Sequence, residues 1–197
     1  MPSRGDSRTQ QKLLLSLLVI GVLGGVMALG VSGSFSATTQ SAGNELRAGT
    51  VEIGDNDSAA SLYNSTAVKP GDTTASCIKV SYTGSIAASV LVYANGTPAT
   101  LAPYIDLTIT QGTQSAATFP SCTGFVADSG GPLFSGTLQS LEQTHGGYAT
   151  GIPTGSSWAS GDARVYRVQT TLQSTAPDSA QGTSTGPHSF IWEARSN

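Results

Sequence analysis

Apolar and polar residues alternate in short runs along most of the chain beyond residue 48. Gly, Pro, Asn or Asp bounds each run. A period of two over a short run is typical of a β-strand with one buried face. Strands are therefore predicted at residues 75–82, 85–94, 104–110, 122–127, 133–138, 163–172 and 188–194, and a single helical turn at 138–144.

These runs are too short and too rich in β-branched residues to favour helices. No helical crossovers of about 10 to 15 residues separate them, so the strands are expected to pair antiparallel. The predicted fold class is all-β, an antiparallel jelly-roll-like β-sandwich over residues 49–197 that is preceded by a signal peptide. In the last strand, Phe190 and Trp192 fall on one face, and Trp192 is expected in the core.

The first 33 residues follow a different pattern. Three basic residues precede the uncharged apolar run 13–31, and small residues follow it. This order is that of a secretory signal peptide covering residues 1–33, with cleavage predicted between Gly33 and Ser34. At a rise of 1.5 Å per residue the run would also cross about 28 Å of bilayer, so a retained membrane anchor is the alternative.

Residues 34–48 would form the mature N-terminal segment. The segment opens with the β-prone run 35–39, and a polar linker that contains Gly43 and Asn44 follows. The next run, 49–53, is predicted as the first strand of the domain. A lone strand is not stable in water, so 35–39 needs a neighbour outside its own segment. We interpret it as a candidate donor strand.

The charge and composition of the chain exclude some classes of partner. It has 9 Lys and Arg against 12 Asp and Glu, a formal net charge of −3. An acidic surface disfavours nucleic acid and anionic lipid. We therefore expect no nucleic-acid partner, and membrane contact only before cleavage. Few charges and 24 Gly are typical of a secreted, extracellular β protein rather than a nucleotide-binding one.

Cys77 and Cys122 are the two cysteines of the chain, and both lie in the part that would be exported. An oxidising compartment favours a disulfide between them, with two buried free thiols as the alternative. Closing a loop of this length would stabilise the fold by about 4 kcal/mol on the chain-entropy model.

The segment 128–133, Asp-Ser-Gly-Gly-Pro-Leu, looks like the nucleophile segment of chymotrypsin-type serine proteases. That chemistry needs a histidine base beside the serine. In that family the histidine precedes the serine, whereas His145 and His188 both follow Ser129. Ala127 also stands where the family has Gly. A Gly-Gly-Pro turn between two strands explains the same residues, so no catalytic residue is predicted.

The sequence offers no strong metal motif. Two isolated histidines do not supply the spacing of a zinc protease. Residues 55–58 resemble part of a calcium loop, but Ala60 and Thr66 occupy the positions that need Gly and a bidentate Glu. A simple polar loop is favoured there. We predict no metal site and no cofactor.

Five segments follow the apolar run: FSATT at 35–39, NELRAGTVEI at 44–53, KPGD at 69–72, YTGSIAA at 82–88 and SFIWEA at 189–194. In this order the chain resembles the TasA and camelysin family of secreted bacterial proteins, which carry a SipW-type signal peptide. The resemblance implies a jelly-roll domain of the biofilm matrix, exported and processed by a dedicated signal peptidase.

The resemblance also implies self-assembly into fibres. In the TasA-like case the N-terminal segment of one subunit adds as a strand to the next, and Phe35, Ala37 and Thr39 would lie on one face of that strand. The implied partners are the signal peptidase, further copies of the chain in a head-to-tail homo-oligomer, and other matrix proteins. Cys77 and Cys122 depart from the Gram-positive fibre formers and suggest a domain stiffened by a covalent clamp.

Two alternative functions remain open on sequence grounds. The camelysin name implies a secreted metalloendopeptidase, although this sequence contains no visible ligand set for the metal. A retained apolar run would instead give a membrane-anchored surface adhesin. The favoured hypothesis is a structural protein of the extracellular matrix or cell surface, without enzymatic activity.

Overall fold

The computed structural model describes residues 11–18, 46–155 and 157–197. The chain divides into two units, Met1–Leu46 and Arg47–Asn197. In the first unit, residues 11–18 form an exposed α-helix that includes the start of the apolar run. Within the described ranges, no helix is both long enough and apolar enough to cross a membrane. The predicted cleavage between Gly33 and Ser34 lies outside the described residues.

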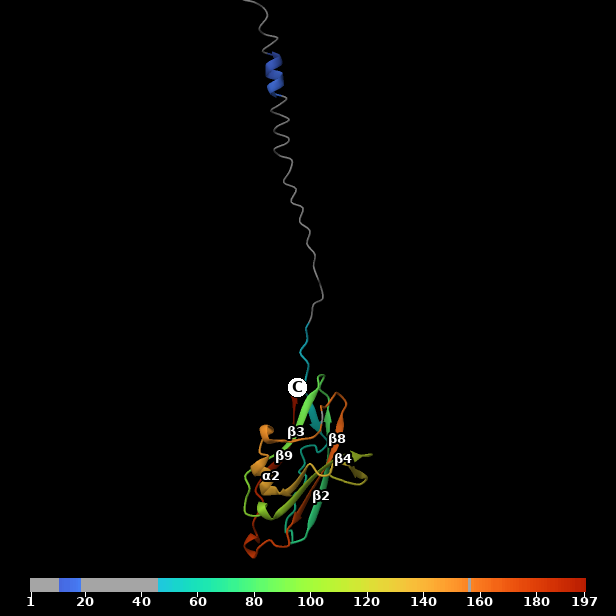
Figure 1. Cartoon of the computed structure of the whole chain (residues 1–197), viewed down its shortest axis with the longest axis vertical. Coiled ribbons are helices and arrows are strands. Elements are labelled where there is room, and N and C mark those ends of the chain that lie inside the picture. Colours follow the sequence, from blue (N-terminus) through green and yellow to red (C-terminus); the bar gives the residue numbers. More distant parts are fainter. Residues whose placement is uncertain (1–10, 19–45, 156) are drawn as a thin grey trace, which may run out of the picture. The chain divides into compact units, whose positions relative to one another are not determined.

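The second unit is mostly β structure in two antiparallel sheets, which confirms the all-β, sandwich-like prediction (Figure 1). The larger sheet has the order β1 (Ile53–Asp55), β2 (Thr73–Tyr82), β8 (Ala163–Leu172), β4 (Ile105–Gln114) and β5 (Phe125–Ala127), and β6 (Phe134–Thr137) also pairs with β4. The smaller sheet has the order β7 (Ile152–Pro153), β3 (Ala88–Gly96) and β9 (His188–Ser196).

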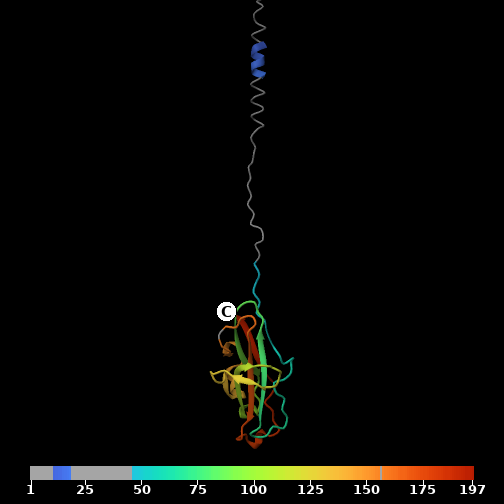
Figure 2. The same ribbon diagram turned by 90° about the vertical axis from the view of Figure 1, so that its right-hand side faces the viewer.

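One short helix and three 3-10 turns lie between the strands. They are α2 (Leu138–Thr144), η1 (Ala102–Tyr104), η2 (Tyr148–Thr150) and η3 (Asp178–Ala180). A long loop, residues 56–72, joins β1 to β2 and runs along the outside of the strands (teal in Figure 2). This loop forms one wall of the site described below.

The hydrophobic core lies between the two sheets. Alternate residues of each strand point into it, such as Ile78 and Val80 of β2 and Val90 and Val92 of β3. Burying each such side chain contributes about 1.5–3 kcal/mol. Trp158 is the largest fully buried side chain. Phe190 and Trp192 of β9 both pack against this core, on the face that the alternation predicts, but they are only partly buried.

The seven strands predicted after residue 72 are all present, with ends that differ from the predictions by up to four residues. β7 was not predicted, and the first strand is misplaced. β8 and α2 occupy the predicted residues 163–172 and 138–144. The predicted strand at 49–53 is wrong, because β1 begins only at Ile53. Its partner β2 ends at Tyr82, so the residues before Ile53 face a turn rather than a strand. There Ser85 N donates to Thr50 O at 2.9 Å.

The predicted disulfide between Cys77 and Cys122 is confirmed, with a Cα–Cα distance of 5.1 Å. Cys77 lies in β2, where it alternates with the core residue Ile78, so the bond is on the opposite face of the larger sheet. Cys77 N also donates to Pro120 O at 2.9 Å. The disulfide therefore fastens the loop before β5 onto β2, and it is consistent with an extracytoplasmic location.

Candidate functional site

β9 forms an edge of the smaller sheet, since β3 is its one partner among the described strands. The main-chain hydrogen bonds of β3 show which N–H and C=O groups of β9 are paired within the sheet. Every second residue of β3 bonds on the side away from β9: Ala88 with Trp158, Val90 with Thr154 and Ala94 with His145. Main-chain bonding alternates along an antiparallel strand, so the intervening β3 residues bond to β9.

This alternation fixes the direction of the main-chain groups of β9. The β3 residues that bond to β9 lie opposite Ile191 and Glu193. The N–H and C=O groups of Phe190, Trp192 and Ala194 therefore point away from β3, along the free edge. Their side chains still face the core, so these residues combine an inward side chain with an outward main chain.

β1 forms an edge of the larger sheet by the same argument. Tyr82 of β2 bonds through its main chain to residues 161 and 162, on the β8 side. Ile53 lies opposite Tyr82 and Gly54 opposite its neighbour, so Gly54 is the residue of β1 that bonds to β2. The main-chain groups of Ile53 and Asp55 consequently point away from the larger sheet.

The two free edges border a single groove of about 450 Å³. Residues 53–55 line it on one side and residues 189–192 on the other, and apolar side chains complete it: Leu62, Ile78 and Val80. The indole Nε1 of Trp192 is buried and has no hydrogen-bond partner in the described part of the chain. The groove thus combines main-chain groups from two edges with an apolar lining.

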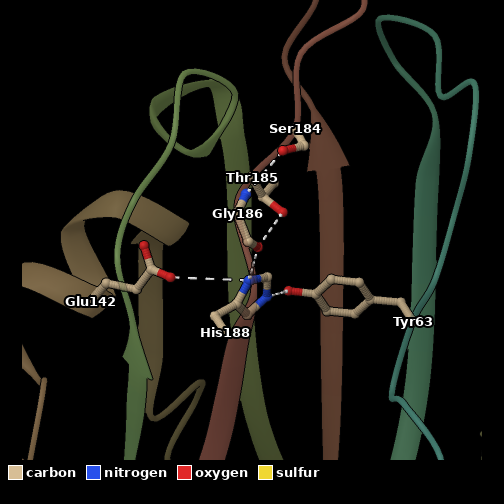
Figure 3. A network of polar contacts seen from close by, with 6 residues as sticks. All are labelled: Tyr63, Glu142, Ser184, Thr185, Gly186 and His188. Atoms are coloured by element: carbon tan, nitrogen blue, oxygen red, sulfur yellow. Dashed lines mark hydrogen bonds and ion pairs between the residues drawn. The ribbon is translucent and has the colours of Figure 1, made fainter.

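Three titratable side chains lie in a row where β9 begins (Figure 3). Tyr63 Oη lies 2.5 Å from His188 Nε2. His188 Nδ1 lies 3.0 Å from Gly186 O and 4.0 Å from Glu142 Oε1. A carbonyl can only accept, so Nδ1 carries the proton and Nε2 of the neutral ring accepts from the Tyr63 hydroxyl. The contacts therefore determine the tautomer of His188.

Glu142 is the most constrained member of this row. Its side chain is fully buried, against 7% exposure for that of His188, and neither carboxyl oxygen has a hydrogen-bond partner among the described residues. Burial raises the pKa of Glu142, and the nearby His188 offsets part of that rise. Burial and the Glu142 charge also raise the pKa of Tyr63, so the phenol stays protonated near neutral pH.

The position of Glu142 on α2 explains its burial. Leu138, Leu141 and Glu142 are spaced i, i+3 and i+4, so they share one face of the helix, and all three are buried. Thr137 caps the start of α2 by accepting from Ser140 N at 3.1 Å. Glu142 was not among the residues predicted from the sequence, although its helical spacing from the two leucines was a usable signal.

Tyr63 and His188 were also missed as partners. They are separated by 125 positions, and no local pattern connects them. The residues predicted to act in self-assembly, Phe35, Ala37 and Thr39, lie outside the described residues, as does the predicted cleavage site.

Ser129 lies in an exposed turn between β5 and β6. The hydrogen bonds of the two histidines go to other groups: His145 Nδ1 lies 2.6 Å from Thr150 O, and His188 bonds as described above. Asp55 and Asp57 accept from main-chain N–H groups of their own loop, as expected of a simple polar loop. No three metal-binding His, Cys, Asp or Glu side chains cluster in residues 11–18, 46–155 and 157–197.

Fold and site together define a disulfide-bonded, antiparallel two-sheet β protein with a groove between one edge of each sheet. No protein-family model matches the chain, and no curated protein matches it either. The resemblance to the TasA and camelysin family gains no support from these comparisons. The function must therefore be inferred from the geometry of the groove and from the sequence that precedes it.

Proposed function

We propose that this protein is a secreted structural protein of the extracellular matrix or cell surface, which self-assembles into fibres by N-terminal strand addition. The observation that carries the proposal is the free edge of β9, where main-chain groups of Phe190, Trp192 and Ala194 point away from β3 and which borders the groove along residues 189–192. An exposed edge of this kind is a template for a further strand. A polypeptide strand is the ligand that such an edge fits best.

The donated strand would come from the N-terminal segment of another copy. Its main chain would bond to the free edge of β9, and alternate side chains, those of Phe35, Ala37 and Thr39, would face the apolar lining of the groove. A head-to-tail contact of this type does not close on itself and therefore propagates as a filament.

We further propose that the sandwich is of the jelly-roll type. The chain crosses from the larger sheet to the smaller after β2 and returns after β3. It crosses again to β7 after β6, returns to β8, and crosses a last time to β9. Repeated crossing between sheets is typical of the Greek-key connections in a jelly roll. An experimental structure with a different strand order would overturn this assignment.

Electron microscopy of the protein purified after export tests the fibre proposal. Filaments are expected from the wild type, and few or none from a variant that lacks residues 34–44. Phe35→Ala removes the one large anchor of the donor strand and should reduce filament yield, whereas Gln40→Ala in the polar linker should not. Filaments that form equally well without residues 34–44 would contradict donor-strand assembly.

The intact mass of the exported protein tests the other half of the proposal. Cleavage before Ser34 leaves the donor strand free at the N-terminus. A mass that retains residues 1–33 would show that the apolar run remains attached, and the membrane-anchored adhesin would then replace the fibre former.

A further inference from the structure

A short segment packs beside the start of β9. Residues 57–63, here called the Tyr63 segment, border the groove together with His188 and Phe190. The Tyr63 ring lies 5.6 Å from the His188 ring and 6.2 Å from the Phe190 ring, measured between centroids. The hydrogen bond from Tyr63 Oη to His188 Nε2 is the polar contact between this side chain and β9 (Figure 3).

Behind His188 lies the buried carboxyl group of Glu142. When Glu142 and His188 hold one proton between them, they form either two neutral groups or an ion pair, and both states leave no net charge in the interior. When that proton is lost, a carboxylate without a hydrogen-bond donor remains buried, which is strongly unfavourable. Water must then reach Glu142.

The direction of this opening follows from the packing around Glu142. On the helix side, Leu138 and Leu141 are fully buried in the core. On the other side, a Cβ built on Gly96 would lie 2.7 Å from Glu142 Oε1 and 2.6 Å from His188 Cβ, so the carboxyl group sits at the end of β3 and the start of β9. Water therefore gains access by loosening the start of β9 from its neighbours, rather than by moving α2.

We propose that Glu142 and His188 form a proton-operated latch, which holds the Tyr63 segment against the start of β9 while the pair is protonated and releases it when the proton is lost. This inference rests on the proposed function of the groove, because release would uncover the part of the β9 edge where a donated strand begins to pair. Strand addition is then favoured at higher pH.

Asp57 lies in the Tyr63 segment itself and accepts from Ala59 N at 2.7 Å. The other titratable groups near these elements bond outside the latch. His145, at the end of α2, bonds to Thr150 O and packs against Phe134. On β9, Glu193 bonds to Tyr93 of β3 and to Arg195. Among the described residues, the titratable side chains that Tyr63, Glu142 and His188 contact are thus one another.

Hydrogen exchange on residues 47–197 tests the latch without any assembly. This fragment contains every strand and every core residue of the β unit but lacks the donor segment. Protection of the Tyr63 segment and of residues 186–190, corrected for intrinsic exchange rates, should fall as the pH rises above the ordinary Glu pKa of 4.5, by up to about tenfold per pH unit. Glu142→Gln should abolish this fall, and Tyr63→Phe should give low protection at every pH.

Glu193→Gln is the matched control, because Glu193 also contacts a tyrosine but lies on the outer face of the smaller sheet. It should leave the pH dependence unchanged. Protection that varies with pH equally in wild type and Glu142→Gln would overturn the latch.

Filament growth of the exported full-length product then links the latch to the groove. Growth should be faster at about pH 8.5 than at about pH 5.5 for the wild type and equal at both for Glu142→Gln. If no filament forms at any pH while exchange still depends on Glu142, the fibre proposal fails and the latch stands. If filaments form but neither growth nor exchange depends on Glu142, the latch fails and the fibre proposal stands.

Discussion

The two sheets of the β unit are secured to different degrees. In the larger sheet, β8 pairs with β2 over nine residues and with β4 over eight, and the disulfide fastens a loop onto β2. In the smaller sheet, β3 pairs with β9 over nine residues but with β7 over only two. The larger sheet therefore supplies most of the frame, and the smaller sheet offers free hydrogen-bonding capacity at β9.

Removal of the disulfide should weaken the frame most. Replacing Cys77 and Cys122 together by alanine is expected to lower the free energy of unfolding by about 4 kcal/mol, because the unfolded chain regains the entropy of an open loop. Equilibrium urea unfolding measures this loss. Reduced wild-type protein should lose a similar amount of unfolding free energy. A loss below about 1 kcal/mol would show that the disulfide does not make the larger sheet more firmly secured than the smaller one.

Proline substitutions at adjacent β9 positions should distinguish the side of the strand that bonds to β3 from the side that is free. Glu193→Pro removes an N–H that bonds to β3 and leaves a β3 carbonyl without its donor, so it should cost about 1–3 kcal/mol of stability. Ala194→Pro removes an N–H that points away from β3 along the free edge, where an edge strand tolerates proline, so its cost should be clearly smaller. Urea unfolding compares the two variants, and filament yield should fall for Ala194→Pro although it remains folded.

Equal loss of stability in both proline variants would contradict the alternation of β9. The result would mean that Ala194 also uses its N–H within the fold. β9 would then not be a free edge, and the groove would no longer be expected to accept a strand.

The pH dependence of stability should reveal the buried carboxyl group. The pKa of Glu142 is raised in the folded state above its ordinary value of 4.5. Its contribution to stability is therefore fully present below that value and is lost as pH rises toward the folded pKa, by about 1.4 kcal/mol for each pH unit that separates the unfolded from the folded pKa. Glu142→Gln should remove this decline, so its stability relative to wild type should increase with pH.

Unfolding curves at several pH values measure that difference. A variant whose stability runs parallel to that of the wild type would show that Glu142 is solvated in the folded state. The start of β9 in the smaller sheet would then lack the buried carboxyl group whose ionisation makes it sensitive to pH.

The smallest effect is expected at the outer face of the smaller sheet. Tyr93 donates to Glu193 Oε2 at 2.7 Å, and this bond, together with Arg195, lowers the pKa of Glu193. That contribution is present above the ordinary pKa and is lost as pH falls through the lowered one. Tyr93→Phe should cost less than about 1 kcal/mol at neutral pH, and less still in acid, by urea unfolding.

Local alternation was enough to predict much of the fold. β8 and α2 were located because their periodicities of 2 and 3.6 extend over whole elements. The start of β1 was not predicted, because its position depends on where its partner β2 ends. The distribution of strands between the two sheets also depends on contacts far apart in sequence, which no local pattern records.

The site was less predictable than the fold. The disulfide was predictable because the chain contains only two cysteines. The free edge of β9 depends on the hydrogen bonds of β3 to residues 145, 154 and 158, which the sequence does not order in space. The contact between Tyr63 and His188 is of the same kind. Glu142 alone carried a local signal, through its position on the buried face of α2.

If the proposed fibres form, the outward main chain of Phe190, Trp192 and Ala194 has a consequence for their composition. Peptide N–H and C=O groups are the same in nearly every residue, so an edge built from them does not discriminate among incoming strands. Selectivity then depends on how well donor side chains fit the apolar lining. A cell that secretes several chains with similar N-terminal segments would build copolymers, whose proportions follow the rates of secretion.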